Sequence, residues 1–131
     1  MFGGRWSSAG TRIAYTAEHL SLAMVEYFVH IDAGDPPKDL VVVAADIPDS
    51  VSRVFVRLEK LPIDWRQVPA PPALAAIGDA FAAERKSAIL VLPSAVVPSE
   101  ANWLINPLHP EFAQIQVRPA EPFQYDARFF T

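Results

Sequence analysis

The 131-residue sequence contains no cysteine, and this absence removes several classes of chemistry at once. Disulfides, cysteine-ligated zinc, iron–sulfur clusters and thiolate nucleophiles all require that residue. Histidine is scarce too, since only His19, His30 and His109 are present. They form no His-x-x-x-His pair and have no carboxylate at the spacing of metal ligands. The sequence therefore predicts no metal site.

Basic runs and long apolar runs are also missing. The net charge is −4 and lysines and arginines are scattered, which argues against direct nucleic acid binding. No stretch is long enough to cross a bilayer, and the N-terminus shows no apolar run after a basic start. We therefore expect a cytoplasmic protein that binds no membrane.

The usual signatures of hydrolases and nucleotide-binding proteins do not occur either. There is no Gly-x-Ser-x-Gly elbow, no Walker-type phosphate loop and no Gly-x-Gly-x-x-Gly. A nucleotide, if bound, must be held in another way.

What is present describes one small domain. Half of the residues are apolar, and 13 prolines stand against five glycines. Such a chain can form a hydrophobic core, but prolines cut its elements short. We expect a single α+β domain, with a mixed or antiparallel sheet and a few helices.

Periodicity predicts the individual elements. Two helices are expected, one capped by Thr16 with Glu18 in its first turn and running to about residue 30, and one over about 73–85. The first should bury a stripe that includes Leu20 and Tyr27. Strands are expected over 12–16, 53–58 (half-exposed), 88–92, 113–118 and 128–130, and an interior strand over 40–45. Segments 62–72 and 99–110 are expected to be loops.

Glu26 is the most informative polar residue of the first helix. Leu22, Ala23, Val29 and His30 lie one turn to either side of it. A carboxylate beside an apolar stripe costs free energy unless it is hydrogen-bonded or paired. Two interpretations follow, a surface glutamate that reaches solvent or a positioned catalytic carboxylate.

Other candidates carry a similar choice. Arg5 follows two glycines, and its guanidinium suits a diphosphate unless it merely lies on the face of Trp6. Tyr15 ends a strand and is either a site residue or core packing, while Ser94 after Pro93 is typical of a turn. Three residues in the 99–110 loop commonly hold a loop's own backbone: Asn102, Asn106 and His109.

The order and wording of these residues resemble the RES domain family, named for its arginine, glutamate and serine. The matching pieces are GGRW (3–6), Gly10, IAYTAEHLSLAMVE (13–26), the FVH of 28–30, IGDAF (77–81), VLPSAVVPSEANWLINPLHPEF (91–112), and Pro122-Phe123 with Asp126-Ala127-Arg128. The match covers nearly the whole chain, and the proline-rich block over 91–112 is unusual in composition.

The resemblance implies a fold similar to the diphtheria-toxin type of ADP-ribosyltransferase. It implies the toxin half of a type II toxin–antitoxin pair, neutralised by an Xre-like helix-turn-helix antitoxin, and it leaves room for a homodimer. NAD⁺ would be the substrate, degraded at its nicotinamide–ribose bond, and no cofactor is implied.

Carried over by position, the family's site residues are Arg5, Tyr15, Glu26 and Ser94. Glu26 would stabilise an oxocarbenium-like ribose, Arg5 would hold the pyrophosphate, and Tyr15 would stack near the nicotinamide. Ser94 would hydrogen-bond the nicotinamide side or orient Glu26. Water or phosphate would accept the ADP-ribose, which makes the enzyme a glycohydrolase or a phosphorylase.

One departure from the family pattern concerns the N-terminus. Family members usually have about two dozen residues ahead of GGRW, including a strand, whereas this sequence starts at Met1-Phe2. Either the start was assigned late or this member lacks that edge strand. Two alternatives to NAD⁺ degradation remain. The similarity of fold leaves open a protein ADP-ribosyltransferase, and the missing strand leaves open an impaired domain that only binds its antitoxin.

Overall fold

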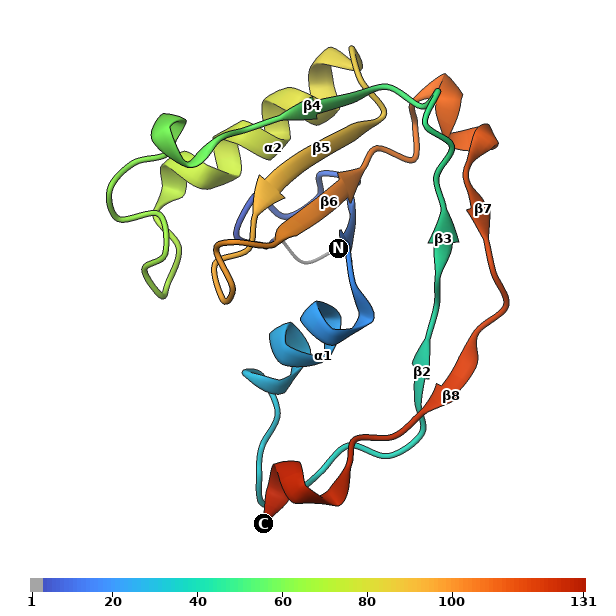
Figure 1. Cartoon of the computed structure of the whole chain (residues 1–131). Helices are drawn as coiled ribbons and strands as arrows, with labels where there is room; N and C mark the ends of the chain where they lie inside the picture. Colours follow the sequence, from blue (N-terminus) through green and yellow to red (C-terminus); the bar gives the residue numbers. More distant parts are fainter. Residues whose placement is uncertain (1–3) are drawn as a thin grey trace.

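A four-stranded mixed sheet forms the centre of the computed structural model, which describes residues 4–131 (Figure 1). Its strand order is β1 (Ala14–Ala17), β6 (Ala101–Ile105), β5 (Ile89–Pro93) and β4 (Arg53–Phe55). Strand β6 is antiparallel to both neighbours, whereas β4 and β5 are parallel because helix α2 (Pro72–Glu84) crosses over between them. The predicted α+β class is confirmed. Met1, Phe2 and Gly3, the first glycine of GGRW, lie outside the described residues.

Helix α2 covers one face of the sheet. It begins at Pro72, whose fixed φ suits the first helical position, and ends at Arg85 with a φ of 54°. Leu74 and Phe81 pack against Leu90 and Leu92 of β5, as the predicted second helix and the strand over 88–92 require. The core on this face also includes three residues from outside α2 and β5: Trp6, Trp65 and Leu104.

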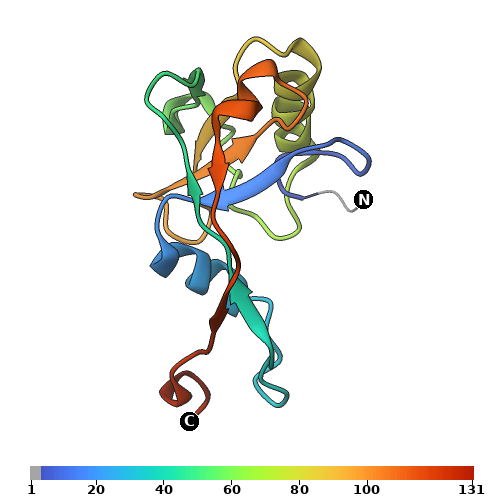
Figure 2. The same cartoon turned by 90° about the vertical axis from the view of Figure 1, so that its right-hand side faces the viewer.

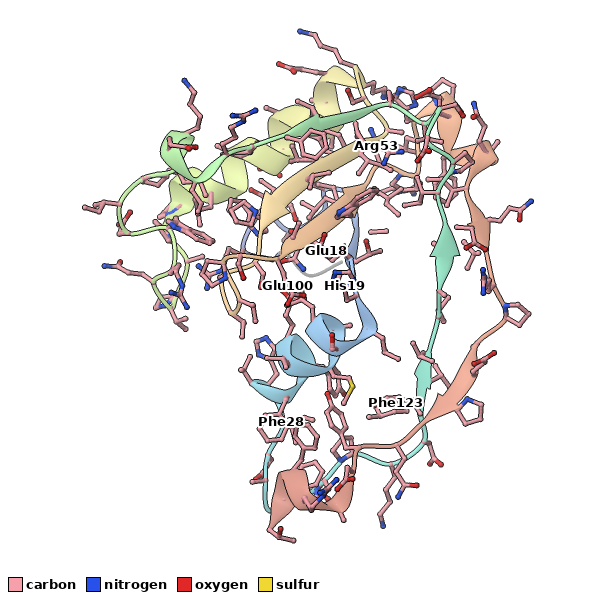
Figure 3. All side chains as sticks on the ribbon, viewed as in Figure 1. Glu18, His19, Phe28, Arg53, Glu100 and Phe123 are labelled. Atoms are coloured by element: carbon pink, nitrogen blue, oxygen red, sulfur yellow. The ribbon has the colours of Figure 1, made fainter. Side chains whose placement is uncertain are left out.

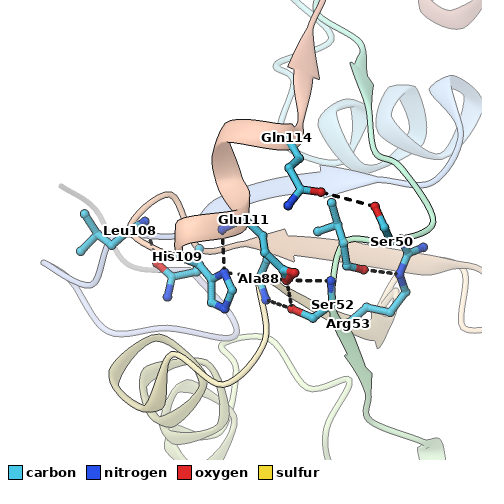
Figure 4. Close-up of polar contacts among 10 residues, drawn as sticks. Ser50, Ser52, Arg53, Ala88, Leu108, His109, Glu111 and Gln114 are labelled. Atoms are coloured by element: carbon cyan, nitrogen blue, oxygen red, sulfur yellow. Dashed lines mark hydrogen bonds and ion pairs between the residues drawn. The ribbon is translucent and has the colours of Figure 1, made fainter.

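The opposite face carries a second core around Ile89, Val91 and Ile105, because residues alternate across a strand. Hydrogen bonds join the 3₁₀ helix η2 (Pro110–Gln114) to Ser52, the residue just before β4 (Figure 4). Glu111 accepts from the Ser52 backbone N–H at 2.9 Å and from its hydroxyl, and the Ser52 hydroxyl accepts from Ala88 N at 2.9 Å. Those bonds from Ser52 lower the pKa of Glu111.

A two-stranded arm stands away from the sheet (Figure 2). In it β2 (Leu40–Val42) pairs with β8 (Glu121–Phe123), and β3 (Ala45–Asp46) pairs with β7 (Gln116–Val117). The prediction of one interior strand over 40–45 is therefore wrong: the run is split in two and Val41 is 60% exposed. Hydrophobic β-branched residues fit a pleated ribbon whether or not it is buried.

The first helix is shorter than predicted. Thr16 does not cap it but lies in β1, where its hydroxyl donates to Trp103 O at 2.7 Å. Helix α1 spans Leu20–Phe28 with His19 at the N-cap, so Glu18 precedes the first turn. The predicted buried stripe is also wrong, because Leu20 and Tyr27 are half-exposed and Leu22 is the buried residue of this helix.

The C-terminal segment packs on the far side of α1. Phe28 contacts the rings of Tyr125, Phe129 and Phe130, with centroids 5.3 to 6.1 Å apart. The Tyr125 hydroxyl donates to Met24 O at 2.5 Å, and burial raises the pKa of this tyrosine. This cluster fixes the side of α1 that faces away from the sheet.

Three further expectations need correction. Segment 99–110 is not only loop, because Ala101–Ile105 form the interior strand β6. The predicted strand over 128–130 is the 3₁₀ helix η3 (Ala127–Phe130), begun by Asp126, which accepts from Arg128 N at 2.9 Å. The strands expected over 113–118 and 53–58 are each reduced to a shorter piece, β7 and β4, and the 3₁₀ helix η1 (Leu58–Lys60) follows β4.

The loop over 62–72 forms as predicted, with Trp65 buried in the core. Within residues 4–131, no helix has both the length and the apolar content that crossing a bilayer requires.

Candidate active site

Glu26 and Ser94 come together although 68 positions separate them in the sequence. Leu22 anchors α1 on the domain, and Glu26 lies one helical turn further along the same face. The Ser94 hydroxyl, at the end of β5, donates to Glu26 Oε2 at 2.9 Å. Ser94 is fully buried and Glu26 is half-buried. Glu26 is therefore not a surface glutamate that reaches only solvent.

Ser94 also has the turn role that its sequence context predicts. Its hydroxyl oxygen accepts from Val96 N at 3.2 Å and Val97 N at 3.1 Å. Since the oxygen is held from that side, its single proton points at the carboxylate. The turn and the contact with Glu26 are two parts of one arrangement.

Asn102 also belongs to this cluster, although its sequence context predicts a residue that holds the backbone of its own loop. It lies on β6 opposite Leu92, and its amide donates to Glu26 Oε1 at 2.8 Å. Asn106 and His109 do hold the local backbone, as predicted: Asn106 Oδ1 accepts from Leu108 N and His109 Nδ1 from Glu111 N, each at 3.0 Å. Only the placement of Asn102 in a strand that faces α1 distinguishes it from them.

Tyr15 shares the sheet face of Asn102. In the β1–β6 register Tyr15 is paired with Leu104 and Ala17 with Asn102, so Tyr15 and Asn102 are diagonal neighbours on one face. The Tyr15 hydroxyl hydrogen-bonds Ser7 Oγ at 2.5 Å, and the side chain remains 44% exposed. A Cβ on Gly4 would lie 2.8 Å from that hydroxyl, so a larger residue there would require the Tyr15 side chain to move.

Arg5 contacts a loop rather than the carboxylate. Its Nη1 donates to Trp65 O at 2.8 Å and to Gln67 O at 2.9 Å, and partial burial lowers the pKa of the guanidinium. Arg66 in the same loop donates from Nε to Ala95 O at 2.8 Å, next to Ser94. The 62–72 loop therefore connects the segment of Arg5 to the turn of Ser94.

Helix α2 fixes the segment that carries Arg5. Gly78 lies against the backbone of Trp6, where an added Cβ would be 1.8 Å from the Trp6 carbonyl oxygen. Asp79 accepts from Ser8 N, the Ser8 hydroxyl and the Thr11 hydroxyl at 2.6 to 2.9 Å. These bonds lower the pKa of Asp79. The IGDAF stretch thus holds the loop after GGRW in place.

One group of potential metal ligands occurs in the described part of the chain. Glu18, His19 and Glu100 place one donor atom each within 4.8 Å of one another, between the sheet and α1 (Figure 3). Glu18 Oε1 already accepts from Ala101 N at 2.8 Å, and it lies 3.9 Å from His19 Nε2. Glu18 therefore has a partner on β6, and the histidine next to it is exposed, so the positions of these two residues need no ion.

A cavity of about 450 Å³ lies beside the cluster rather than over it. It is lined by residues of β4, β5 and the turn before β6, among them Phe55, Arg57, Pro93 and Glu100. None of the four predicted site residues lines it. The Glu26 cluster lies outside this cavity, between α1 and the end of the sheet where β5 ends and β6 begins.

Comparison with known proteins identifies the family. The family model described as "RES domain" matches residues 1–126. The chain belongs to the RES domain family. A RES domain relative from a Sphingobium species, named "Prs ADP-ribosylating toxin", is 36% identical over 96% of this chain and 80% of its own length.

Two further RES relatives are both named "Toxin Res". The protein from Yersinia enterocolitica is 34% identical over 97% of this chain and 84% of its own length. The protein from Pseudomonas putida is 36% identical over 97% of this chain and 86% of its own length. This RES domain is thus similar along nearly its whole length to proteins named as toxins.

Proposed function

We propose that this RES domain is the toxin of a type II toxin–antitoxin pair and that it cleaves the nicotinamide–ribose bond of NAD⁺. The observation that supports this most is the carboxylate of Glu26, held by Ser94 and Asn102 at the end of the sheet. The word "ADP-ribosylating" in the name of the Sphingobium relative supports the same substrate, because NAD⁺ is a source of ADP-ribose.

The reaction suits a site with a single positioned carboxylate. The nicotinamide of NAD⁺ is cationic and departs as a neutral molecule, so its departure needs no general acid. A typical glycosidase uses one of its two carboxyl groups for that step. What remains is to stabilise the positive charge that develops on the ribose, and a fixed anion does this.

The residues take the following roles in the proposal. Glu26 stabilises the oxocarbenium-like ribose and hydrogen-bonds a ribose hydroxyl. The exposed face of Tyr15 lies along the nicotinamide ring, and Arg5 binds the pyrophosphate with the N–H groups that the 62–72 loop does not use. Ser94 orients Glu26, which its hydrogen bond favours over a contact with nicotinamide.

The acceptor completes the stoichiometry. With water, NAD⁺ gives nicotinamide, ADP-ribose and one proton; with inorganic phosphate, it gives nicotinamide and ADP-ribose 1″-phosphate. We propose one of these small acceptors. The toxic consequence is loss of NAD⁺, and an Xre-like helix-turn-helix antitoxin neutralises it by covering the Glu26 cluster.

Transfer of ADP-ribose to a protein is the second candidate, and the name of the Sphingobium relative favours it. Both candidates share the first bond cleavage and differ only in the acceptor. NAD⁺ labelled in its adenylate half separates them when the chain is incubated with cell extract. Label in free ADP-ribose or in ADP-ribose 1″-phosphate supports the small acceptor, and label that precipitates with protein overturns it.

A further inference from the structure

The surroundings of Asn102 allow its side-chain amide only one orientation. Its Nδ2 donates to Glu26 Oε1 at 2.8 Å and to Thr16 O at 3.3 Å. Turning the amide over would bring its oxygen against a carboxylate and a carbonyl, both of which only accept. The two acceptors therefore fix the orientation of the amide, and Asn102 faces Glu26 as a donor.

The carboxylate of Glu26 is held at both oxygens by one structural unit. Oε1 accepts from Asn102 and Oε2 accepts from Ser94. Both donors belong to the β5–β6 hairpin, in which Asn102 is paired with Leu92 two positions before Ser94. The hairpin forms the middle of the sheet, so its side chains have a fixed frame.

The packing contacts of α1, at Leu22 and in the Phe28 cluster, hold the helix but do not include the Glu26 carboxylate. The helix has nine residues, and Leu22 is the one that the structure shows as fully buried. A glutamate on such a helix keeps its rotamer freedom unless other groups hold the carboxylate. Ser94 and Asn102 supply that restraint from the sheet.

We propose that Asn102 is a positioning residue of the reaction, which fixes the Glu26 carboxylate for the ribose through Oε1. The inference rests on the proposed function for its catalytic consequence, whereas the hydrogen bond itself is independent of that function. Asn102 acts through Glu26 and needs no contact with NAD⁺. Its loss therefore lowers kcat for NAD⁺ cleavage and leaves KM nearly unchanged.

Two substitutions separate donation from packing. Asn102→Ala removes the donor, and we expect kcat to fall by about 10- to 100-fold, the range that loss of one hydrogen bond to a charged group gives. Asn102→Asp keeps the size of the side chain but turns an acceptor toward Glu26, so its kcat falls at least as far. Gln124→Ala, an exposed amide in the C-terminal segment, is the matched control and keeps wild-type kcat.

The order of the two variants decides the role. If Asn102 only fills space, the similarly sized Asn102→Asp retains more activity than Asn102→Ala, and that order overturns the proposal. An equal loss of thermal stability in both variants does not change the kcat comparison, provided that each is folded at the assay temperature.

A second measurement does not depend on activity. The chain has only two asparagines, and Asn106 donates to Ala82 O at 3.3 Å, away from the site. In ¹⁵N spectra, Glu26→Ala should shift the Asn102 side-chain amide and accelerate its exchange with water, while the Asn106 amide stays unchanged. An Asn102 amide that does not respond overturns the positioning bond. If the Asn102 amide responds to Glu26→Ala but the wild-type chain leaves NAD⁺ intact, the hydrogen bond stands and the proposed function is overturned.

Discussion

Ser94 Oγ lies 2.9 Å from Glu26 Oε2 and is directed toward it by two backbone N–H groups of its own turn. The proposed chemistry depends on this relationship, because a carboxylate stabilises a developing cation only from a fixed position. The turn after β5 and the face of α1 meet at this bond, which links the proline-rich block to the first helix.

Removing the Ser94 hydroxyl should therefore impair the reaction. Ser94→Ala leaves Oε2 without its donor, and we expect kcat for NAD⁺ cleavage to fall by about 10- to 100-fold. Ser99→Ala, an exposed serine in the following turn, is the control and should behave as wild type. Steady-state kinetics on both variants test this, and equal kcat values for the two would refute the role of Ser94.

Arg5 holds the 62–72 loop and, in the proposal, also binds the pyrophosphate. Substrates with and without phosphate groups separate these two roles. Arg5→Ala removes both bonds to the 62–72 loop, which loosens Trp65 and shifts the tryptophan fluorescence. If Arg5 also binds the pyrophosphate, KM should rise for NAD⁺ but not for nicotinamide riboside, which has no phosphate. A parallel change for both substrates would show that Arg5 acts only through the loop. Arg12→Ala, an exposed arginine on the same segment, serves as the control.

Gly78→Ala should destabilise the domain despite the higher helix propensity of alanine. The new methyl carbon would lie 1.8 Å from Trp6 O, so the helix and the segment of Trp6 must separate. We expect a loss of about 1–3 kcal/mol in the free energy of unfolding. Gly34→Ala, whose nearest contact would be Asp32 Oδ1 at 3.4 Å, should change it little. Urea denaturation measures both, and an unaffected Gly78→Ala would contradict the packing of α2 on Trp6.

The interaction of Asp79 with the loop over 8–11 predicts a pH dependence. Hydrogen bonds from Ser8 and Thr11 lower the pKa of Asp79 below its ordinary value of 3.8 in the folded chain. A carboxyl with a lowered folded pKa contributes stability above its unfolded pKa and loses it as the pH falls through the folded pKa. Asp79→Asn should therefore reduce stability at pH 7 and flatten the acid side of the profile. An unchanged slope below about pH 5 would contradict these bonds.

The sequence predicted the parts of this fold that have strong local patterns. Helix α2 and strand β5 lie where apolar periodicity and the flanking prolines put them. Strand β6 was missed because Asn102 interrupts its apolar run and Pro98 and Pro107 flank it closely. Only its pairing with β1 and β5 on both sides makes it a strand, and that pairing is not visible locally.

The site divides in the same way. Glu26 and Ser94 were chosen by residue type and resemblance, and the structure brings them within hydrogen-bonding distance. The sequence gives Asn102 the same expected role as Asn106 and His109, because all three lie between prolines. Its contact with Glu26 depends on the β5–β6 register, which places Asn102 near the start of β6, at the end of the sheet next to α1. The one local indication of a strand was that Asn102 and Leu104, on either side of Trp103, would share one face of it.

The hydrogen bonds from Arg5 to Trp65 and Gln67 could not be predicted from the sequence, for a different reason. They join residues 60 and 62 positions apart through main-chain carbonyls, which carry no signature of residue type. A sequence can nominate a cation for a ligand, but only the fold shows which backbone oxygens compete for it.

Release of free nicotinamide from NAD⁺, followed by chromatography for the wild-type chain and for Glu26→Gln, tests the central claim most directly. The substitution keeps the shape of the side chain and removes the charge, so circular dichroism should show a retained fold. We predict nicotinamide release by the wild type and near-complete loss in Glu26→Gln. Release at the wild-type rate by a folded Glu26→Gln protein would contradict the assignment of Glu26 as the catalytic carboxylate.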